Sequence, residues 1–264
     1  MSRSCCNNGN SARNWSGRNR ASPAITRAST YRDDGTVLGV NPGEFLGIRN
    51  MNSETSARVH AAEQALSDLI RAAEAFHAAG VGPLVRASEA IIASIEAGGK
   101  VLIFGNGGSA AEAQHWAAEL TGRFLRERRA LPAIALTVDT SALTAIGNDY
   151  GFDRIFERQV EALGAPGDVA IGISTSGKSA NVIRAMESAS KAGLTTIALA
   201  GTQQRPELAC CNHCISFPAE ATPRIQELHL LAIHVVCDLV EAHFAGVEAD
   251  DRDTNGSMPL CNAA

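Results

Sequence analysis

Residues 101–120 constrain the fold more than any other part of this 264-residue chain. An apolar run at 101–104 is typical of a buried parallel strand. Three of the next four residues, 105–108, are glycines, which allow a tight turn and the close approach of a ligand to the backbone. Ser109 stands where a helix N-cap is expected, and strong helix formers fill 110–120. The segment therefore predicts a strand, a ligand-binding turn and a helix.

The turn at 105–108 is expected to bind an anion. Backbone N–H groups at the start of a helix are unpaired, and the helix dipole places positive charge there. A phosphate group is the expected ligand. The glycine spacing does not match the dinucleotide-binding fingerprint, and no Gly-Lys-Ser/Thr sequence follows for a P-loop, so a nucleotide is not indicated.

A second segment follows the same pattern, with hydroxyl groups at its turn. A strand is expected at 168–173 and a helix that runs up to 192. Four hydroxyl side chains lie between them, those of Ser174, Thr175, Ser176 and Ser179. Hydroxyl groups are common in turns and caps, but a cap needs one of them, whereas a phosphate has several oxygens to bind. Lys178 either adds a positive charge to this loop or faces solvent. Because no sequence typical of magnesium binding or of nucleotide-base binding lies nearby, we predict a phosphorylated small molecule as the ligand.

Two further sets of polar residues could carry chemistry. His115 and Glu119 are four residues apart on the first predicted α/β helix, so they share one face, where they would bind a metal, move protons or simply face solvent. Gln226 and His234 are eight residues apart, roughly 12 Å along a helix axis. One ion contacts both only at full side-chain reach, or when one of them comes from a neighbouring subunit. His229 is closer to Gln226, and the spacing alone does not choose between the histidines.

Composition excludes several classes of partner. The chain is 45% hydrophobic with a net charge of −5, so no basic excess indicates nucleic acid. We find no apolar run long enough to span a membrane. Seven cysteines without a paired framework favour reduced thiols in a cytoplasm. Cys211 and Cys214 have C-x-x-C spacing, but no second pair matches it, so buried, inert thiols are favoured over a zinc or redox site.

The order of the patterns predicts one α/β domain at 51–245. Strands are expected at 101–104, 132–137, 168–173, 195–200 and 213–217. Helices are expected at 53–79, 83–97, 110–120, 139–147, 152–163 with Asp153 as its N-cap, up to 192, and at 222–245. This alternation is typical of a doubly wound, five-stranded parallel sheet flanked by helices, with ligands beyond the carboxyl ends of the strands. The two helices ahead of the first strand would cover the sheet or pack against another subunit.

The two ends of the chain do not follow these patterns. Residues 1–50 lack apolar periodicity and carry six arginines before the first acidic residue, Asp33. Three interpretations of residues 1–50 are open: a transit peptide, a disordered basic arm, or a start codon assigned too early. We favour the last, because helical patterning begins directly after Met51. Residues 246–264 form an acidic tail that we expect to be flexible.

From about Met51 to Phe244 the chain resembles sugar isomerase (SIS) domain proteins, and specifically the phosphoheptose isomerase family. The matching motifs are Gly105-Asn106-Gly107-Gly108-Ser109, His115-x-x-x-Glu119, Gly147-Asn148-Asp149, Ile173-Ser174-Thr175-Ser176-Gly177 with Ser179, and Arg224-Ile225-Gln226-Glu227 with His234. The hydroxyl loop alone would specify only the superfamily. Its combination with His115, Glu119, Gln226 and His234 is much narrower.

The resemblance implies an enzyme that interconverts sedoheptulose 7-phosphate and glycero-manno-heptose 7-phosphate, an early step of heptose synthesis for bacterial envelope glycans. It implies phosphate binding by Ser109, Ser174, Thr175, Ser176 and Ser179. It implies a sugar site lined by Asn106, Gly107, Gly108, Glu119, Asn148, Asp149 and Gln226. It implies a Zn²⁺ ion bound by His115, Glu119, Gln226 and His234, a mixed nitrogen and oxygen set that zinc accepts. It also implies a homotetramer with shared active sites, with the early helices packed between subunits.

Aldose–ketose isomerisation moves a proton between adjacent carbons through an enediol, and so needs a base and an acid. We assign Glu119 as the base and His234 as the acid, with zinc either polarising the carbonyl or holding the hydroxyl pair. Binding to a metal would lower the basicity of Glu119, so its two roles compete.

A non-catalytic SIS module is the alternative function, either an adaptor of the bacterial replication initiator or a sensor of sugar phosphates. The adaptor lacks the acid–base pair that this chain carries, and no helix-turn-helix domain precedes the fold.

The chain departs from the family pattern at Lys178, at 202–206 and at Pro223, which affects the detail of substrate binding rather than the reaction class.

Overall fold

The computed structural model describes residues 53–201, 208 and 210–246. Residues from Ala57 onward group into one compact unit. The elements of the chain are α1 (Ser53–Ala79), α2 (Gly82–Glu96), β1 (Val101–Gly105), α3 (Gly108–Thr121), β2 (Ala133–Ala135), α4 (Thr140–Tyr150), the 3₁₀ helix η2 (Phe152–Arg154), α5 (Glu157–Leu163), β3 (Val169–Ser174), α6 (Ala180–Lys191), β4 (Thr195–Gly201), β5 (His213–Phe217) and α7 (Thr222–Ala245). The predicted extension at 1–50 and the tail beyond Gly246 lie outside the described residues.

The five strands form one parallel sheet in the order β2-β1-β3-β4-β5. This confirms the predicted doubly wound α/β fold. The strands are short, and β1 and β3 are buried along their whole length, as expected of central strands covered on both faces. Gly105 at the end of β1 lies opposite Ile173, next to the end of β3. The loops that follow β1 and β3 therefore leave the sheet side by side.

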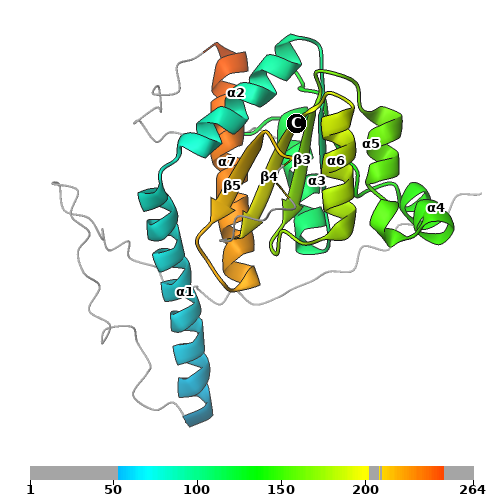
Figure 1. Ribbon diagram of the computed structural model, residues 1–264. Helices are drawn as coiled ribbons and strands as arrows, with labels where there is room; N and C mark the ends of the chain where they lie inside the picture. The colour runs from blue at the N-terminus through cyan, green and yellow to red at the C-terminus, as the bar shows by residue number, and fades with distance from the viewer. Residues whose placement is uncertain (1–52, 202–207, 209, 247–264) are drawn as a thin grey trace, which may run out of the picture. The chain divides into compact units, whose positions relative to one another are not determined.

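Helices cover both faces of the sheet (Figure 1). One apolar core packs α2, α3 and α7, together with Ala72 and Phe76 of α1, against one face. A second core packs α5 and α6, together with Ile155 and Phe156 that follow η2, against the other. Trp116 of α3 and Phe104 of β1 are the largest fully buried side chains and belong to different cores. The chain thus passes to one face after β1 and to the other face after β3.

A buried ion pair holds the amino ends of β1 and β3 together. The Asp168 carboxylate accepts hydrogen bonds from the backbone N–H of Lys100 (2.9 Å), from Lys100 Nζ (2.5 Å) and from the backbone N–H of Ala165 (2.8 Å). Burial alone would raise the pKa of Asp168, but these hydrogen bonds outweigh it and hold the pKa below its ordinary value of 3.8. The pair helps to keep the two strands in the register that brings their carboxyl ends together.

Two predicted helix boundaries were wrong. The helix expected at 152–163 is divided, because the chain bends at Ile155 and Phe156 to bury both side chains. Asp153 does not cap a helix there, and its carboxylate pairs with Arg184 at 2.9 Å. The helix expected to stop at Gly147 continues to Tyr150, since the residue that leaves the helical conformation is Gly151, with φ +95°.

Helix α7 is long and apolar enough to cross a membrane, judged by length and composition alone, and α1 and α2 pass the same test as a pair bent by 74°. The expectation that no apolar run reaches this length was therefore wrong. Half of the apolar window of α7 is buried inside the fold, where Leu228, Ile233 and Val236 pack in the core. The hydropathy of α7 is explained by its place as a core helix.

Candidate active site

The candidate site lies at the carboxyl ends of β1 and β3. These strands are neighbours, and the helices that follow them, α3 and α6, pack on opposite faces of the sheet. In open parallel sheets such a switch point leaves a crevice in which ligands bind, with the N-termini of both helices directed at it. The two loops predicted to bind phosphate are therefore brought to one place.

The glycine turn after β1 has the close approach that its sequence predicts. A Cβ atom at Gly105 would lie 2.8 Å from the Ile173 carbonyl oxygen and 2.8 Å from the Ser109 Cβ, so only glycine fits there. Gly107 has φ +57° and is the N-cap of α3. The prediction that Ser109 caps this helix was therefore wrong. Ser109 lies within the first turn and is 3% exposed, because the glycines let the helix begin earlier.

The hydroxyl loop after β3 keeps its side chains free of helix capping. Ser179 is the N-cap of α6, yet within the described structure its hydroxyl makes no capping bond and instead lies 3.0 Å from the Ser174 hydroxyl. The Ser176 hydroxyl accepts a hydrogen bond from the Lys178 backbone N–H at 3.2 Å. Gly177, with φ +64°, closes the turn. Hydroxyl groups that do not cap the helix remain available to an anion at its N-terminus.

A reciprocal pair of amides joins the two loops. Asn106 and Asn181 donate to each other's side-chain oxygens, both at 2.8 Å, and Asn181 is 3% exposed. A hollow of about 590 Å³ lies beside the pair. It is lined by Asn106, Phe152, Asp153, Ser179, Ala180 and Asn181. Asn181 was not among the predicted site residues, because an asparagine in the first turn of a helix carries no signal of a partner 75 residues away.

Three more predicted residues meet between α3 and α7. His115 Nε2 lies 3.0 Å from His234 Nε2 and 3.3 Å from Glu119 Oε1. One atom from each of the three side chains lies within 4.8 Å of the others. Burial and the neighbouring His115 lower the pKa of His234 below its ordinary value of 6.5, against the opposing charge of Glu119. At neutral pH the His234 imidazole is therefore uncharged and keeps a free lone pair.

The chemistry of this cluster fits a metal ion. Two imidazole nitrogens and one carboxylate form a donor set typical of zinc sites that leave a coordination position open. The Nε2 atoms of His115 and His234 face each other at 3.0 Å, and the Glu119 carboxylate lies alongside. A cation placed among these three groups could contact all of them. No cysteine belongs to a comparable cluster in the described part of the chain.

Comparisons with known proteins agree with this geometry. A sequence model of the SIS domain family matches residues 63–201. The chain is 53% identical over 169 residues to a phosphoheptose isomerase of Trichlorobacter lovleyi, an alignment that covers 64% of this chain and 86% of that protein. The chain belongs to the phosphoheptose isomerase family. A second member, from Aquifex aeolicus, is 60% identical over 151 residues, covering 57% of this chain and 79% of that protein.

The fold of the family agrees as well. The structure of a phosphoheptose isomerase from Neisseria gonorrhoeae superposes with a TM-score of 0.65 and 46% identity, covering 71% of this chain and 99% of that one.

The structure separates the two histidines that spacing could not distinguish. His234 faces His115, whereas His229 is fully buried and its Nδ1 lies 3.3 Å from Glu112 Oε2. His229 Nε2 is buried without a hydrogen-bond partner among the described residues. Five residues on one helix amount to about 1.4 turns, so the two imidazoles point in different directions. His229 is thus a buried residue of the α3–α7 contact.

Gln226 does not join the cluster within one chain. A Cβ atom at Gly108 would lie 2.2 Å from Gln226 Nε2, so this amide packs on the first residue of α3. His115 is seven residues further along α3, about 10 Å away along the axis. Metal binding by Gln226 remains a prediction that requires a neighbouring subunit, while its place beside the glycine turn suits its predicted contact with the sugar.

Asn148 and Asp149 lie at the end of α4. Their side chains are exposed, and Asn148 Nδ2 donates to Asp149 Oδ1 at 2.8 Å. Asp149 is not in the cluster of His115, Glu119 and His234. Their predicted contact with the sugar remains a prediction.

The cysteines of the C-x-x-C motif are only partly as expected. Cys214 is exposed and Cys211 is half-buried, so the expectation of buried thiols was wrong for Cys214. Burial, with the charges of Cys210 and Cys214, raises the pKa of Cys211, and burial also raises that of Cys214. Protonated thiols are poor nucleophiles and poor metal ligands, which agrees with the expectation that they are inert.

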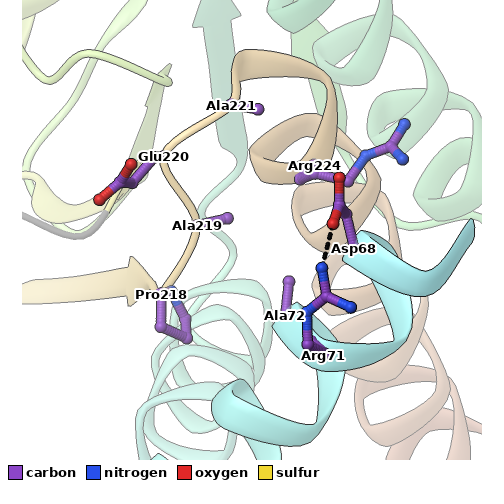
Figure 2. A pocket seen from close by; sticks show the side chains of 8 residues that line it. All are labelled: Asp68, Arg71, Ala72, Pro218, Ala219, Glu220, Ala221 and Arg224. Carbon is purple, nitrogen blue, oxygen red and sulfur yellow. Dashed lines mark hydrogen bonds and ion pairs between the residues drawn. The ribbon is translucent and has the colours of Figure 1, made fainter. Parts of the chain in front are cut away.

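A second hollow, of about 410 Å³, lies between α1 and the connection from β5 to α7 (Figure 2). Figure 2 shows Arg71 paired with Asp68 at its edge, with Arg224 nearby. Arg224 Nη2 donates to Glu227 Oε1 at 2.6 Å, and Nη1 donates to the Ala65 carbonyl oxygen. None of the predicted catalytic residues lines this hollow. It is separate from the candidate active site.

Proposed function

We propose that this chain interconverts sedoheptulose 7-phosphate and glycero-manno-heptose 7-phosphate through an enediol. It is an isomerase of a family whose members at 53% and 60% identity are phosphoheptose isomerases. The observation that carries the proposal is the meeting of Glu119 and His234, a carboxylate and an imidazole from two different helices. An acid and a base in reach of one another are what proton transfer between adjacent carbons requires.

The two halves of the site suit the two ends of the substrate. The phosphate is at carbon 7, and the carbonyl group is at carbon 1 or 2, so the phosphate loops and the acid–base pair must be separated. His115 lies about 10 Å beyond the start of α3. Ser109, Ser174, Thr175, Ser176 and Ser179 would bind the phosphate, while Glu119 removes the proton from carbon 1 and His234 returns a proton.

The proposal includes a bound Zn²⁺ ion. His115, Glu119 and His234 would hold it, with Gln226 supplied by a neighbouring subunit. When bound, the ion would polarise the substrate carbonyl. Glu119 keeps a second carboxylate oxygen for proton transfer if only one oxygen faces the two imidazoles. The neutral state of His234, which follows from its lowered pKa, suits ligation.

The proposal also includes a homotetramer with shared active sites, located in the cytoplasm. Its support is an apolar face on α1, where Leu66 is 65% exposed and Ile70 is 59% exposed. These residues are four apart and share one side of the helix, and such a face on a surface helix is typical of subunit contacts. Val81 and Val85 are exposed at the start of α2. No nucleic acid and no membrane are part of the proposed function.

Incubation of the purified protein with sedoheptulose 7-phosphate tests the function. We expect formation of the aldose 7-phosphate, detected by chromatography that separates the unreduced ketose and aldose phosphates, and a rate that increases when Zn²⁺ is added to metal-free protein. The matched control is sedoheptulose without phosphate, which should react far more slowly because the loops have nothing to bind. No conversion of the phosphorylated sugar with zinc present would contradict the proposal and favour a non-catalytic binding module.

The phosphate loop makes a separate prediction. Ser174→Ala and Ser176→Ala should each raise KM, because a hydrogen bond to a charged group contributes about 1.5–3 kcal/mol, or roughly tenfold to a hundredfold in kcat/KM. Ser190→Ala, at the far end of α6 where the side chain is exposed, is the control and should behave as wild type. Steady-state kinetics measures the effect. Normal KM values for both loop variants would place the phosphate elsewhere.

A further inference from the structure

A buried carboxylate fixes the segment that follows α3. Residues 122–132 contain no helix or strand, yet Glu241 of α7 accepts three hydrogen bonds from their backbone. The donors are the N–H groups of Phe124 (2.7 Å), Leu125 (2.6 Å) and Arg126 (2.7 Å). Glu241 is 1% exposed. Short, charge-assisted bonds from three successive N–H groups compensate a buried charge and hold this stretch of backbone in one conformation.

A buried arginine joins the same carboxylate to the end of α3. The Arg128 side chain is 1% exposed, and its Nε lies 3.6 Å from Glu241 Oε1. Its Nη2 donates to the Glu119 carbonyl oxygen at 2.6 Å, and its Nη1 donates to the Gly122 carbonyl oxygen at 2.8 Å. Carbonyl groups in the last turn of a helix have no partner within it, so the guanidinium caps α3. The residue that carries the proposed base is thereby tied to α7.

The fixed segment places an aromatic ring on His234. The Phe124 ring is stacked on the His234 imidazole, with centroids 5.3 Å apart and planes inclined by 29°. The His115 ring is the imidazole's other neighbour, with centroids 5.1 Å apart and planes inclined by 49°. The imidazole therefore has two aromatic neighbours. In this position its Nε2 faces His115 Nε2 at 3.0 Å.

We propose that Phe124, held in place by Glu241, is a positioning residue for the His234 imidazole. The inference rests on the proposed isomerisation, in which His234 acts. The χ2 angle of histidine is broad, so a half-buried imidazole without a neighbour on its face can present either nitrogen or neither to the substrate. A flat ring stacked on it removes most of these orientations. Phe124 touches no reacting atom and acts through His234.

The test replaces the flat ring at position 124. Phe124→Leu should lower kcat about tenfold with KM unchanged, because the phosphate anchor is intact and only the orientation of a catalytic group is lost. Phe124→Tyr keeps the ring and should restore most of kcat. Leu125→Ala is the matched control: its N–H also bonds to Glu241, but its side chain is 58% exposed, so the rate should stay at the wild-type value.

A second measurement does not depend on turnover. The imidazole proton and nitrogen signals of His234, assigned by their absence in His234→Gln, should shift in Phe124→Leu and stay near the wild-type positions in Phe124→Tyr and Leu125→Ala. Glu241→Gln, which replaces one acceptor oxygen by a donor, should move the same signals, and thermal melting will show whether it also loses stability.

Unchanged His234 signals and an unchanged kcat in Phe124→Leu would overturn the proposal. Equal losses in Phe124→Leu and Leu125→Ala would also overturn it, because the segment would then matter only for packing. If the wild-type protein turns over no sugar phosphate, the proposed function is wrong, and the His234 signals still decide whether Phe124 positions the ring.

Discussion

Glu119→Gln is expected to slow isomerisation by several orders of magnitude while leaving the substrate bound. The amide keeps the size of the side chain, but it has no basic oxygen to remove a proton from carbon. General base catalysis contributes about 10²–10⁴-fold, so we expect a loss of kcat in that range. Exchange of the substrate proton with deuterium oxide should fall by the same factor, because exchange requires the same first step. The phosphate loops are untouched, so binding of sedoheptulose 7-phosphate measured by calorimetry should persist.

The control for this variant is Glu127→Gln. Glu127 lies in the segment after α3, and its side chain is 88% exposed, so loss of its charge should leave rate and exchange unchanged. Zinc content must be measured for each protein, because Glu119 is also a proposed ligand. Ordinary exchange in Glu119→Gln with zinc still bound would show that another residue is the base, and His234 would be the first replacement.

His234→Gln is expected to separate the two proton transfers. If His234 returns the proton at the far end of the enediol, turnover should fall by about 10²–10³-fold while proton exchange at carbon 1 continues, because Glu119 is still present. The ratio of exchange to product formation should therefore rise. Mass spectrometry of the recovered ketose and the newly formed aldose measures both quantities in one reaction.

A second histidine on the same helix provides the comparison for His234→Gln. His243 is 43% exposed and its Nε2 lies 2.7 Å from Glu96 Oε1, away from the cluster, so His243→Gln should keep both exchange and turnover. If His234→Gln retains its zinc and loses exchange and turnover in equal measure, His234 does not act in the second transfer alone. Zinc loss on substitution would instead show that its main part is to hold the metal.

Local features of the sequence determined the elements and the two loops. The apolar run before Gly105 and the glycines after it predict a buried strand and a turn without reference to any distant residue, since backbone freedom and hydrophobic periodicity act over a few residues. The same holds for Ser174 and its neighbours. The family pattern added the roles of His115, Glu119 and His234, whose spacing alone was compatible with a solvated helix face.

Which residue begins or ends a helix could not be predicted from the local sequence, because it depends on how the helix packs in the fold. Gly147 was expected to end a helix, but it lies within α4, and Gly151 has the positive φ instead. Ser109 was expected at the N-cap, and it lies inside the helix because Gly107 takes that position. In each case two residues competed for one role, and the packing of the neighbouring strand and helix decided between them.

Only the tertiary structure decided which side chains from different helices meet. Spacing shows that His229 and His234 are five residues apart, but which of them faces His115 depends on how α3 and α7 are rotated against each other. In the sequence, Glu241 stands out only as a charged residue in a helix that is largely apolar, and this does not predict its partners. Its partners, the backbone N–H groups from Phe124 to Arg126, lie more than a hundred residues earlier. Residues on one helix share a face through local geometry, whereas contacts between helices follow from the close packing of two apolar surfaces, which the whole fold sets.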